Sequence, residues 1–244
     1  MSVCRDSRNR SPYETGRLDA APFSDSLRDE RVFRPGGLEL TARAVALAQL
    51  AAGATILDLG CGSGHTTRWL RAQGFNAIGI DCADNGETSV MASAEALPMA
   101  DGSADAVLAE CSFSLFEDRA RALAECARVL IDGGRLIISD LYARHPEAIA
   151  EVRSLRDSCA SGMLVREELE AILSNAGFIV NVWEDHSRAL RECAARFLFE
   201  QGSLDGLWGC RGDSSAIQGA MRTARAGYFL LIAMRSNRTN EKRE

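Results

Sequence analysis

Short apolar runs alternate along the chain with longer amphipathic stretches, and this order predicts an α/β protein with a doubly wound sheet. Seven apolar runs predict strands at residues 55–59, 75–80, 88–92, 104–109, 135–141, 178–183 and 228–234. Helical spacing or helix boundary signals predict helices at residues 38–50, 65–73, 117–130, 166–175 and 189–199. In the third of these, for example, Leu123, Cys126, Ala127 and Leu130 recur at i, i+3, i+4 and i+7.

Two regions interrupt the alternation and suggest the domain organisation. Residues 1–50 precede the first strand, and we expect them to form an N-terminal helical cap. The main domain then covers residues 51–244, with an insertion at about 185–227 between the last two strands. A hairpin would need only about two to five residues there. We therefore expect the insertion, which includes the glycine-rich stretch 202–212, to act as a lid or substrate-binding element.

Composition and charge narrow the class of protein. The chain has 244 residues, of which 46% are hydrophobic and 25% charged, as in ordinary globular domains. The apolar run at 228–234 is too short to cross a bilayer, which needs roughly 20 residues, and no secretory leader is visible. Because the net charge is −6 and the positive residues are scattered, we expect neither nucleic acid nor membrane as a partner.

The eight cysteines show no CxxC pair and no zinc-finger spacing to histidine. Without an export signal, reduced thiols in the cytoplasm are the default expectation. We therefore predict a cytoplasmic protein with no bound metal, whose cysteines mostly pack as small apolar residues.

A glycine cluster follows the first strand and is the strongest local signal. The run Asp58-Leu59-Gly60-Cys61-Gly62-Ser63-Gly64 leads directly into a predicted helix. Glycines allow a ligand to lie close to bare main chain, and the free N–H groups at the helix start face it. A second acid, Asp81, ends the next strand, where a carboxylate can accept both ribose hydroxyls. With two acids and no Lys or Arg in the loop, a cationic nucleoside such as S-adenosylmethionine is a better ligand than a polyphosphate.

These segments resemble the class I S-adenosylmethionine-dependent methyltransferases, in particular their small-molecule, methyltransferase-11-like branch. The glycine cluster matches the family's first motif, and Gly79-Ile80-Asp81 matches its acidic second-strand end. Residues 94–98, 101–107 and 128–136 resemble the small-molecule branch. The resemblance implies a Rossmann-like, doubly wound, seven-stranded sheet that is mostly parallel with an antiparallel last strand.

The resemblance also implies roles for individual residues toward S-adenosylmethionine. The glycine loop, with Cys61, would pass along the methionine part, and Asp58 would hold its amino group. Asp81 would bind the ribose. The other expected cofactor contacts are Gly60, Gly62, Cys82, Ala94, Glu95 and Glu110, with Tyr13 and Arg34 near the methionine carboxylate. One departure is Ser93, where many relatives have Asp.

The methyl acceptor is less evident, because the sulfonium is already activated and a base is needed only for a protonated acceptor. Glu110, His186 and Cys210 are the candidate catalytic residues, and Tyr142, Trp183 and Trp208 are further candidates on the acceptor side. After the fourth strand the chain reads Glu110-Cys111-Ser112-Phe113, unlike the family's DNA- and protein-methylating enzymes. We therefore expect a small-molecule acceptor.

Two alternatives stay open. The first is an arsenite-type methyltransferase in which Cys82, Cys111, Cys159 and Cys210 converge on a metalloid. The second is a protein that binds S-adenosylmethionine without catalysis, as a sensor or partner module. The sequence defines neither the acceptor atom nor the oligomeric state.

Overall fold

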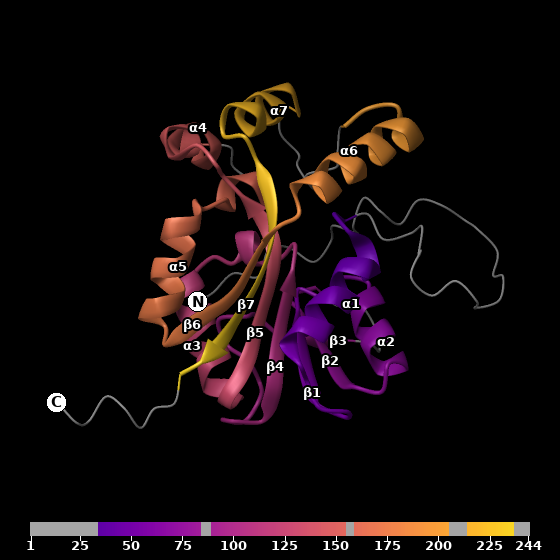
Figure 1. The fold of residues 1–244 in the computed structure, drawn as a ribbon, viewed down its shortest axis with the longest axis vertical. Helices are drawn as coiled ribbons and strands as arrows, with labels where there is room; N and C mark the ends of the chain where they lie inside the picture. Colours follow the sequence, from indigo (N-terminus) through magenta and orange to yellow (C-terminus); the bar gives the residue numbers. More distant parts are fainter. Residues whose placement is uncertain (1–33, 84–88, 155–158, 205–213, 237–244) are drawn as a thin grey trace.

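A computed structural model describes residues 34–83, 89–154, 159–204 and 214–236. Within these ranges the strands form one seven-stranded sheet in the order β3-β2-β1-β4-β5-β7-β6 (Figure 1). The strands are β1 (Thr55–Leu59), β2 (Asn76–Asp81), β3 (Ser89–Met91), β4 (Ala104–Glu110), β5 (Leu130–Tyr142), β6 (Phe178–Asp185) and β7 (Gly227–Arg235). β7 runs antiparallel to both of its neighbours, and the other pairs are parallel. The predicted fold class is confirmed.

Helices connect these strands and cover the sheet. They are α1 (Gly37–Ala48), α2 (His65–Ala72), α3 (Arg119–Val129), α4 (Ile149–Arg153), α5 (Arg166–Asn175), α6 (Ser187–Gln201) and α7 (Ser214–Thr223). Three short 3-10 turns are η2 (Phe113–Leu115), η3 (Pro146–Ala148) and η4 (Cys159–Gly162). None of the helices in the described ranges has the length and apolar character needed to cross a membrane.

Two hydrophobic cores lie on opposite faces of the sheet, because successive side chains of a strand point to opposite sides. In β1, Ile56 packs in the core that lies beneath α1 and α2. This core also contains Leu70 of α2. Its neighbour Leu57 packs on the other face with Leu123 of α3 and Leu169 of α5. Figure 1 shows this arrangement, with α1 and α2 on one side of the strands and α3 and α5 on the other.

The cap predicted for residues 1–50 falls partly outside the described residues. Its last helix, α1, packs Leu40, Ala44 and Ala48 into the same core as the sheet. In the structure, α1 is therefore one of the layers over the sheet. The domain boundary at residue 50 stays a prediction.

The start of β5 differs from the prediction. Residues Asp132-Gly133-Gly134 were expected to form a turn before the strand, yet β5 already begins at Leu130 and runs through them. The pairing with β4 shifts at this point, since Ala104 faces Leu130 while Ala106 faces Arg135. Gly133 has φ +73°, a conformation that favours glycine, and the chain therefore forms an irregular, bulge-like step within β5 where a separate turn was predicted.

The insertion between β6 and β7 contains α6 and α7, and the glycine-rich stretch 205–212 lies outside the described residues. α6 extends the helix predicted at residues 189–199 by two residues at each end, and α7 is a helix that was not predicted. Ile217, Ala220 and Met221 of α7 and Ala224 just after it recur at i, i+3, i+4 and i+7, and all four are buried. This pattern was the signal that could have found the helix.

Candidate active site

The glycine loop joins β1 to α2 at the carboxyl end of the strands, where ligands bind in open α/β sheets. Gly60, Gly62 and Gly64 have φ values of +70°, +51° and +74°, which favour glycine. At Gly60 a Cβ atom would also overlap the Cβ of Ser112, which follows β4. The hydroxyl of Ser112 donates to the carbonyl of Leu59 at 2.7 Å. The segment after β4 therefore lies directly against the glycine loop.

Asp81 connects the end of β2 to the same loop. One carboxylate oxygen accepts the N–H of Gly62 at 2.8 Å, and the other accepts the N–H of Ala83 at 2.9 Å. Each oxygen keeps further lone pairs for additional donors. Apart from Gly62 and its two chain neighbours, no atom of the described residues lies within 4 Å of the position that a Cβ of residue 62 would take. The arrangement offers a bare main-chain surface beside an acceptor-only carboxylate.

Asp58 faces inward. Its side chain accepts a hydrogen bond from the hydroxyl of Thr67 at 2.6 Å, and the residue is 2% exposed. Burial raises the pKa of this carboxyl to about 7, although the Thr67 bond opposes the shift. In the structure Asp58 thus fastens the first turn of α2 to β1, and its predicted contact with the methionine amino group stays a prediction.

Glu110, at the end of β4, lies at the centre of a buried polar cluster. Its carboxylate contacts the guanidinium of Arg34 at 2.7 Å and accepts hydroxyl hydrogens from Thr41 at 2.8 Å and Thr66 at 3.0 Å. Arg34 also donates to Thr66 at 2.6 Å. Burial alone would lower the pKa of Arg34, but the acidic groups around it, Glu110 foremost, together outweigh burial and raise the pKa. The cluster joins α1, α2 and β4 beside the glycine loop.

The other predicted cofactor contacts lie around this loop or outside the described residues. Cys61 is half-buried within the loop and Cys82 is exposed after Asp81. Ala94 is buried. The Glu95 carboxylate accepts the backbone N–H groups of Glu117 and Asp118 at 3.0 and 3.3 Å, so it faces the start of α3. Tyr13 lies outside the described residues.

The candidate acceptor residues do not gather around Glu110. β4 and β6 are separated by two strands, about 14 Å at a spacing of about 4.8 Å per strand. His186 follows β6 and contacts Glu184 at 2.9 Å, which in turn binds Arg43 of α1. Trp183 stacks on Phe229 with ring centroids 4.8 Å apart.

Tyr142 belongs to a separate network at the carboxyl ends of β5 and β6. Its hydroxyl donates to Asp185 at 3.0 Å, and Arg144 binds the same carboxylate at 2.6 Å. This network lies at the root of the insertion. Trp208 and Cys210 lie outside the described residues.

A thiolate site is not formed by the part of the chain that the structure describes, since no three His, Cys, Asp or Glu residues there are placed to hold a metal. The thiol of Cys111 pairs with the hydroxyl of Tyr228 at 2.9 Å. Burial raises the pKa of Cys111 to about 12, which keeps it protonated. The side chain of Cys159 is not described.

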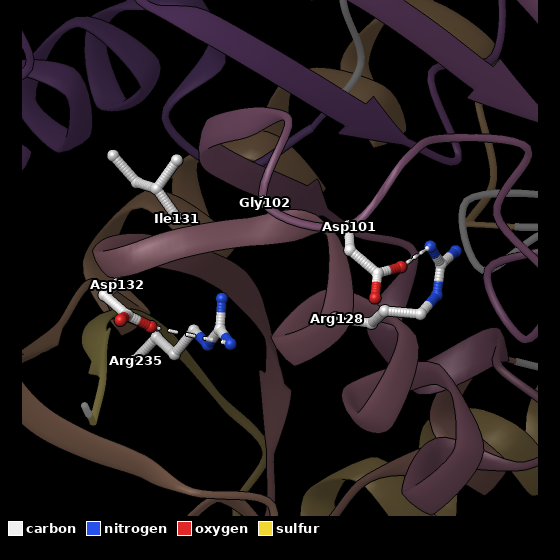
Figure 2. A pocket seen from close by; sticks show the side chains of 6 residues that line it. All are labelled: Asp101, Gly102, Arg128, Ile131, Asp132 and Arg235. Carbon is white, nitrogen blue, oxygen red and sulfur yellow. Dashed lines mark hydrogen bonds and ion pairs between the residues drawn. The ribbon is translucent and has the colours of Figure 1, made fainter. Parts of the chain in front are cut away.

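A separate hollow of about 420 Å³ opens at the opposite edge of the sheet (Figure 2). Its lining includes two cations, each with an anionic neighbour: Arg128 contacts Asp101 at 2.8 Å, and Arg235 contacts Asp132 at 3.6 Å. Because these charges already face one another, the hollow offers no free charge to a ligand. It lies at the amino end of β4 and β5, away from the glycine loop.

Comparison with known proteins agrees with this geometry. The family model described as "Methyltransferase domain" matches residues 57–138. The chain is 31% identical over 154 residues to the O-methyltransferase rstn1 of Aspergillus nomiae, covering 54% of this chain and 68% of that protein. It is also 31% identical to an arsenite methyltransferase of Halobacterium salinarum, covering 54% of this chain but only 39% of that protein.

Solved structures show the same fold. The [4+2]-cyclase SpnF has a TM-score of 0.61 at 24% identity, covering 81% of this chain and 80% of that one. Phosphoethanolamine N-methyltransferase 2 of Haemonchus contortus, solved with S-adenosylmethionine, has a TM-score of 0.62 at 16% identity, covering 83% of this chain and 54% of that one.

The chain belongs to the class I S-adenosylmethionine-dependent methyltransferase family, as the sequence motifs indicated. The cofactor of this family is S-adenosylmethionine, and the open glycine loop with Asp81 fits a nucleoside. Thr41, Thr66 and Ser112 also belong to this site, although none of them was predicted from the sequence. Thr66 could have been found, because Thr66 and Thr67 are adjacent hydroxyl residues in the first turn of the helix that follows the glycine loop.

Proposed function

We propose that this protein transfers a methyl group from S-adenosylmethionine to a small-molecule acceptor. The observation that carries the proposal is the placement of the Asp81 carboxylate on the amide of Gly62, beside open main chain. When bound, the cofactor supplies a methyl group on a sulfonium that is already activated for displacement. The protein then has to bind the cofactor and the acceptor, orient the acceptor atom toward the methyl group and exclude water.

We assign the amino-acid end of the cofactor to the cluster around Glu110. Arg34 and Glu110 offer one cation and one carboxylate within 2.7 Å of each other, which matches the two charges of an amino acid. In this proposal Arg34 faces the carboxylate and Glu110 faces the ammonium. The ribose hydroxyls would donate to Asp81, whose oxygens keep lone pairs beyond their two backbone bonds.

This assignment favours a binding role for Glu110 over the role of a general base. Its carboxylate already accepts bonds from Arg34, Thr41 and Thr66. His186 lies two strands away and is bound to Glu184. We propose that alignment of an acceptor already in its reactive protonation state carries the reaction, with Cys210 left as a prediction outside the described residues.

Oxygen is the acceptor atom that we favour, because a relative of which this chain covers 68%, rstn1 of Aspergillus nomiae, is an O-methyltransferase. The five described cysteine side chains form no disulfide, which agrees with a reducing compartment such as the cytoplasm.

Calorimetry with S-adenosylmethionine and S-adenosylhomocysteine tests the binding half of the proposal. Asp81→Asn should weaken binding by roughly 10–100-fold, since bonds to a charged acceptor are worth about 1.5–3 kcal/mol. Asp101→Asn, in the hollow at the other edge, should leave it unchanged. Binding of a dinucleotide in place of both ligands would overturn the proposal.

A product assay tests the transfer half. The wild-type protein is incubated with S-adenosylmethionine and a panel of phenols, carboxylic acids and amines, and methylated products are identified by mass. Methylation of an oxygen acceptor supports the proposal. Tight binding with no product across the panel would favour the sensor alternative.

Arsenite methylation is a second candidate, favoured by the similarity to the Halobacterium salinarum enzyme. It would need Cys159 or Cys210 to supply the thiolates that the described cysteines do not bring together. Titration of the reduced protein with arsenite, repeated with Cys210→Ser, tests it. Absence of stoichiometric binding would remove this candidate.

A further inference from the structure

The segment after β4 is held by an arginine that binds three backbone carbonyls. Arg119, the first residue of α3, donates from Nε to the carbonyl of Phe113 at 3.2 Å. Its Nη2 donates to the carbonyls of Ser114 at 2.9 Å and Gly162 at 2.8 Å. The planar fork of a guanidinium carries five donors in fixed directions, so one side chain can bind several carbonyls at once. Arg119 thus ties η2 to η4.

Asp140, near the end of β5, holds the same turn from the other side. Its carboxylate accepts the N–H of Ser114 at 2.8 Å and the hydroxyl of Ser114 at 3.1 Å. It also accepts the N–H of Leu141 at 2.7 Å, and the residue is 2% exposed. The N–H and the hydroxyl of Ser114 therefore donate to the Asp140 carboxylate, while its carbonyl accepts from the Arg119 guanidinium. Two opposite charges thus hold one residue.

Gly162 closes this arrangement. A Cβ atom at Gly162 would overlap the carbonyl oxygen of Ser114 and approach the guanidinium of Arg119 within 2.5 Å. Only glycine allows η4 to lie this close to η2. We call Ser114, Arg119, Asp140 and Gly162 the Ser114 clamp.

Ser114 of the clamp lies two residues after Ser112, which packs against the glycine loop. Ser112 packs its Cβ where a side chain at Gly60 would be, and its hydroxyl binds the carbonyl of Leu59. η4, at the other end, leads into Met163, which is buried with α4 and α7 above the sheet. The clamp thus joins the glycine loop to the elements that cover the far half of the sheet.

Stability alone does not account for such a group. Burial lowers the pKa of Arg119 and raises that of Asp140, so both charges are disfavoured where they lie. Apolar packing of the same volume is often equally stabilising or more so. What the charged groups add is a defined direction for every polar atom of Ser114.

We infer that Arg119 and Asp140 are positioning residues, which hold the segment from Cys111 to Phe116 at the boundary between the cofactor and the acceptor. The inference rests on the proposed function, because the glycine loop is the cofactor site in that proposal. Neither residue needs to touch substrate or cofactor.

The test uses Arg119→Gln and Arg119→Lys in the full chain, with Arg121→Lys as the matched control. Arg121 lies on the same helix and donates to one carbonyl only, that of Glu95 at 2.9 Å. Amide hydrogen exchange is followed by mass spectrometry over residues 111–116 and 160–164, together with the affinity for S-adenosylhomocysteine and the midpoint of thermal unfolding.

We expect Arg119→Gln to speed exchange in both segments by about tenfold or more, while the strands β1 and β2 keep their protection. The affinity for S-adenosylhomocysteine should fall by roughly 3–10-fold, as expected for partial loss of preorganisation. Arg119→Lys should retain the charge and still show the defect, and Arg121→Lys should behave as wild type.

Uniformly faster exchange across the protein with unchanged affinity would overturn the inference, since it would mark a residue that only adds stability. If Arg119→Gln does not fold, Ser114→Ala, which removes a single hydroxyl, gives the same readouts. If the wild-type protein does not bind S-adenosylhomocysteine, the proposed function fails. In that case the exchange data alone decide whether Arg119 holds residues 111–116 and 160–164 in place. Faster local exchange in a protein that does not bind the ligand would mean that the clamp is structural and has no role in methyl transfer.

Discussion

Arg34 and Glu110 form an ion pair of 2.7 Å in which the side chains are 13% and 4% exposed. The two residues are far apart in the chain, and the pair joins Arg34, three residues before α1, to the end of β4. Thr41 and Thr66 complete the carboxylate's bonds from α1 and α2. The position of α1 beside the glycine loop is therefore defined by polar contacts as well as by its apolar face.

Replacing Arg34 by Met should destabilise the protein by about 3–5 kcal/mol, because Glu110 would then be a buried charge without its cation. The free energy of unfolding in urea measures this loss. The affinity for S-adenosylhomocysteine should fall in the same variant.

The double variant Arg34→Met/Glu110→Met separates these two effects. It should regain much of the stability, since apolar pairs often replace buried ion pairs at little cost. The affinity for S-adenosylhomocysteine should stay low. Recovery of both properties together would show that the pair has no part in binding.

Asp58 should make stability depend on pH. Burial raises its pKa from 3.8 to about 7, so the folded state binds a proton more tightly than the unfolded state. The stabilisation is fully present below about pH 4 and is lost as the pH rises through about 7. A shift of about 3 units corresponds to up to about 4 kcal/mol at 1.36 kcal/mol per unit.

Asp58→Asn keeps an acceptor for Thr67 but cannot ionise. Urea unfolding at pH 5 and pH 8 should show a smaller loss of stability in this variant than in the wild-type protein. Parallel losses in the two proteins would contradict the assignment to Asp58.

Gly60→Ala and Gly62→Ala form a matched pair. Both positions have positive φ, but only at Gly60 would a Cβ overlap another residue, Ser112. Gly60→Ala should therefore cost several kcal/mol of stability, whereas Gly62→Ala should cost about 1 kcal/mol from the backbone alone.

Binding of S-adenosylhomocysteine distinguishes the two variants further. In Gly62→Ala the new methyl group would lie on the open side of the loop, so affinity should fall although the fold is kept. Unchanged affinity in this variant would place the ligand elsewhere.

Thiol reactivity should follow exposure. Among the cysteines whose side chains the structure describes, Cys82 is exposed, while Cys126 is buried with its pKa raised to about 12. Iodoacetamide at pH 8 should label Cys82 at least tenfold faster than Cys126 or Cys111 in the native protein. Peptide mass spectrometry gives the rates, and equal rates after urea unfolding serve as the control.

The strands of the cofactor half were predictable because each carries an unambiguous local pattern. β1 is an apolar run that ends at three glycines, and its predicted bounds match the structure. α5 matches as well, since its apolar stripe begins after Val165 and ends before Gly177. Local signals of this kind do not depend on the rest of the chain.

The directions of the acidic side chains were not predictable in the same way. Asp58, Asp81 and Glu110 all lie at carboxyl ends of strands, yet one binds a helix, one binds the loop amides and one binds Arg34. Sequence spacing places a residue at the edge of a sheet. The partner that its side chain binds there depends on residues distant in the chain, such as Thr41 and Thr66. The spacing of apolar residues along the sequence does not predict such contacts.

The placement of β7 has a consequence for synthesis on the ribosome. β6 pairs with β7 and with no other strand of the described sheet, and β7 is the last strand to emerge. The nascent chain can therefore assemble β1 to β5 while β6 still waits, with one edge of β5 uncovered. β7 can insert between β5 and β6 only after Arg235 has been translated, so among the described strands the one that completes the sheet is the last to be synthesised.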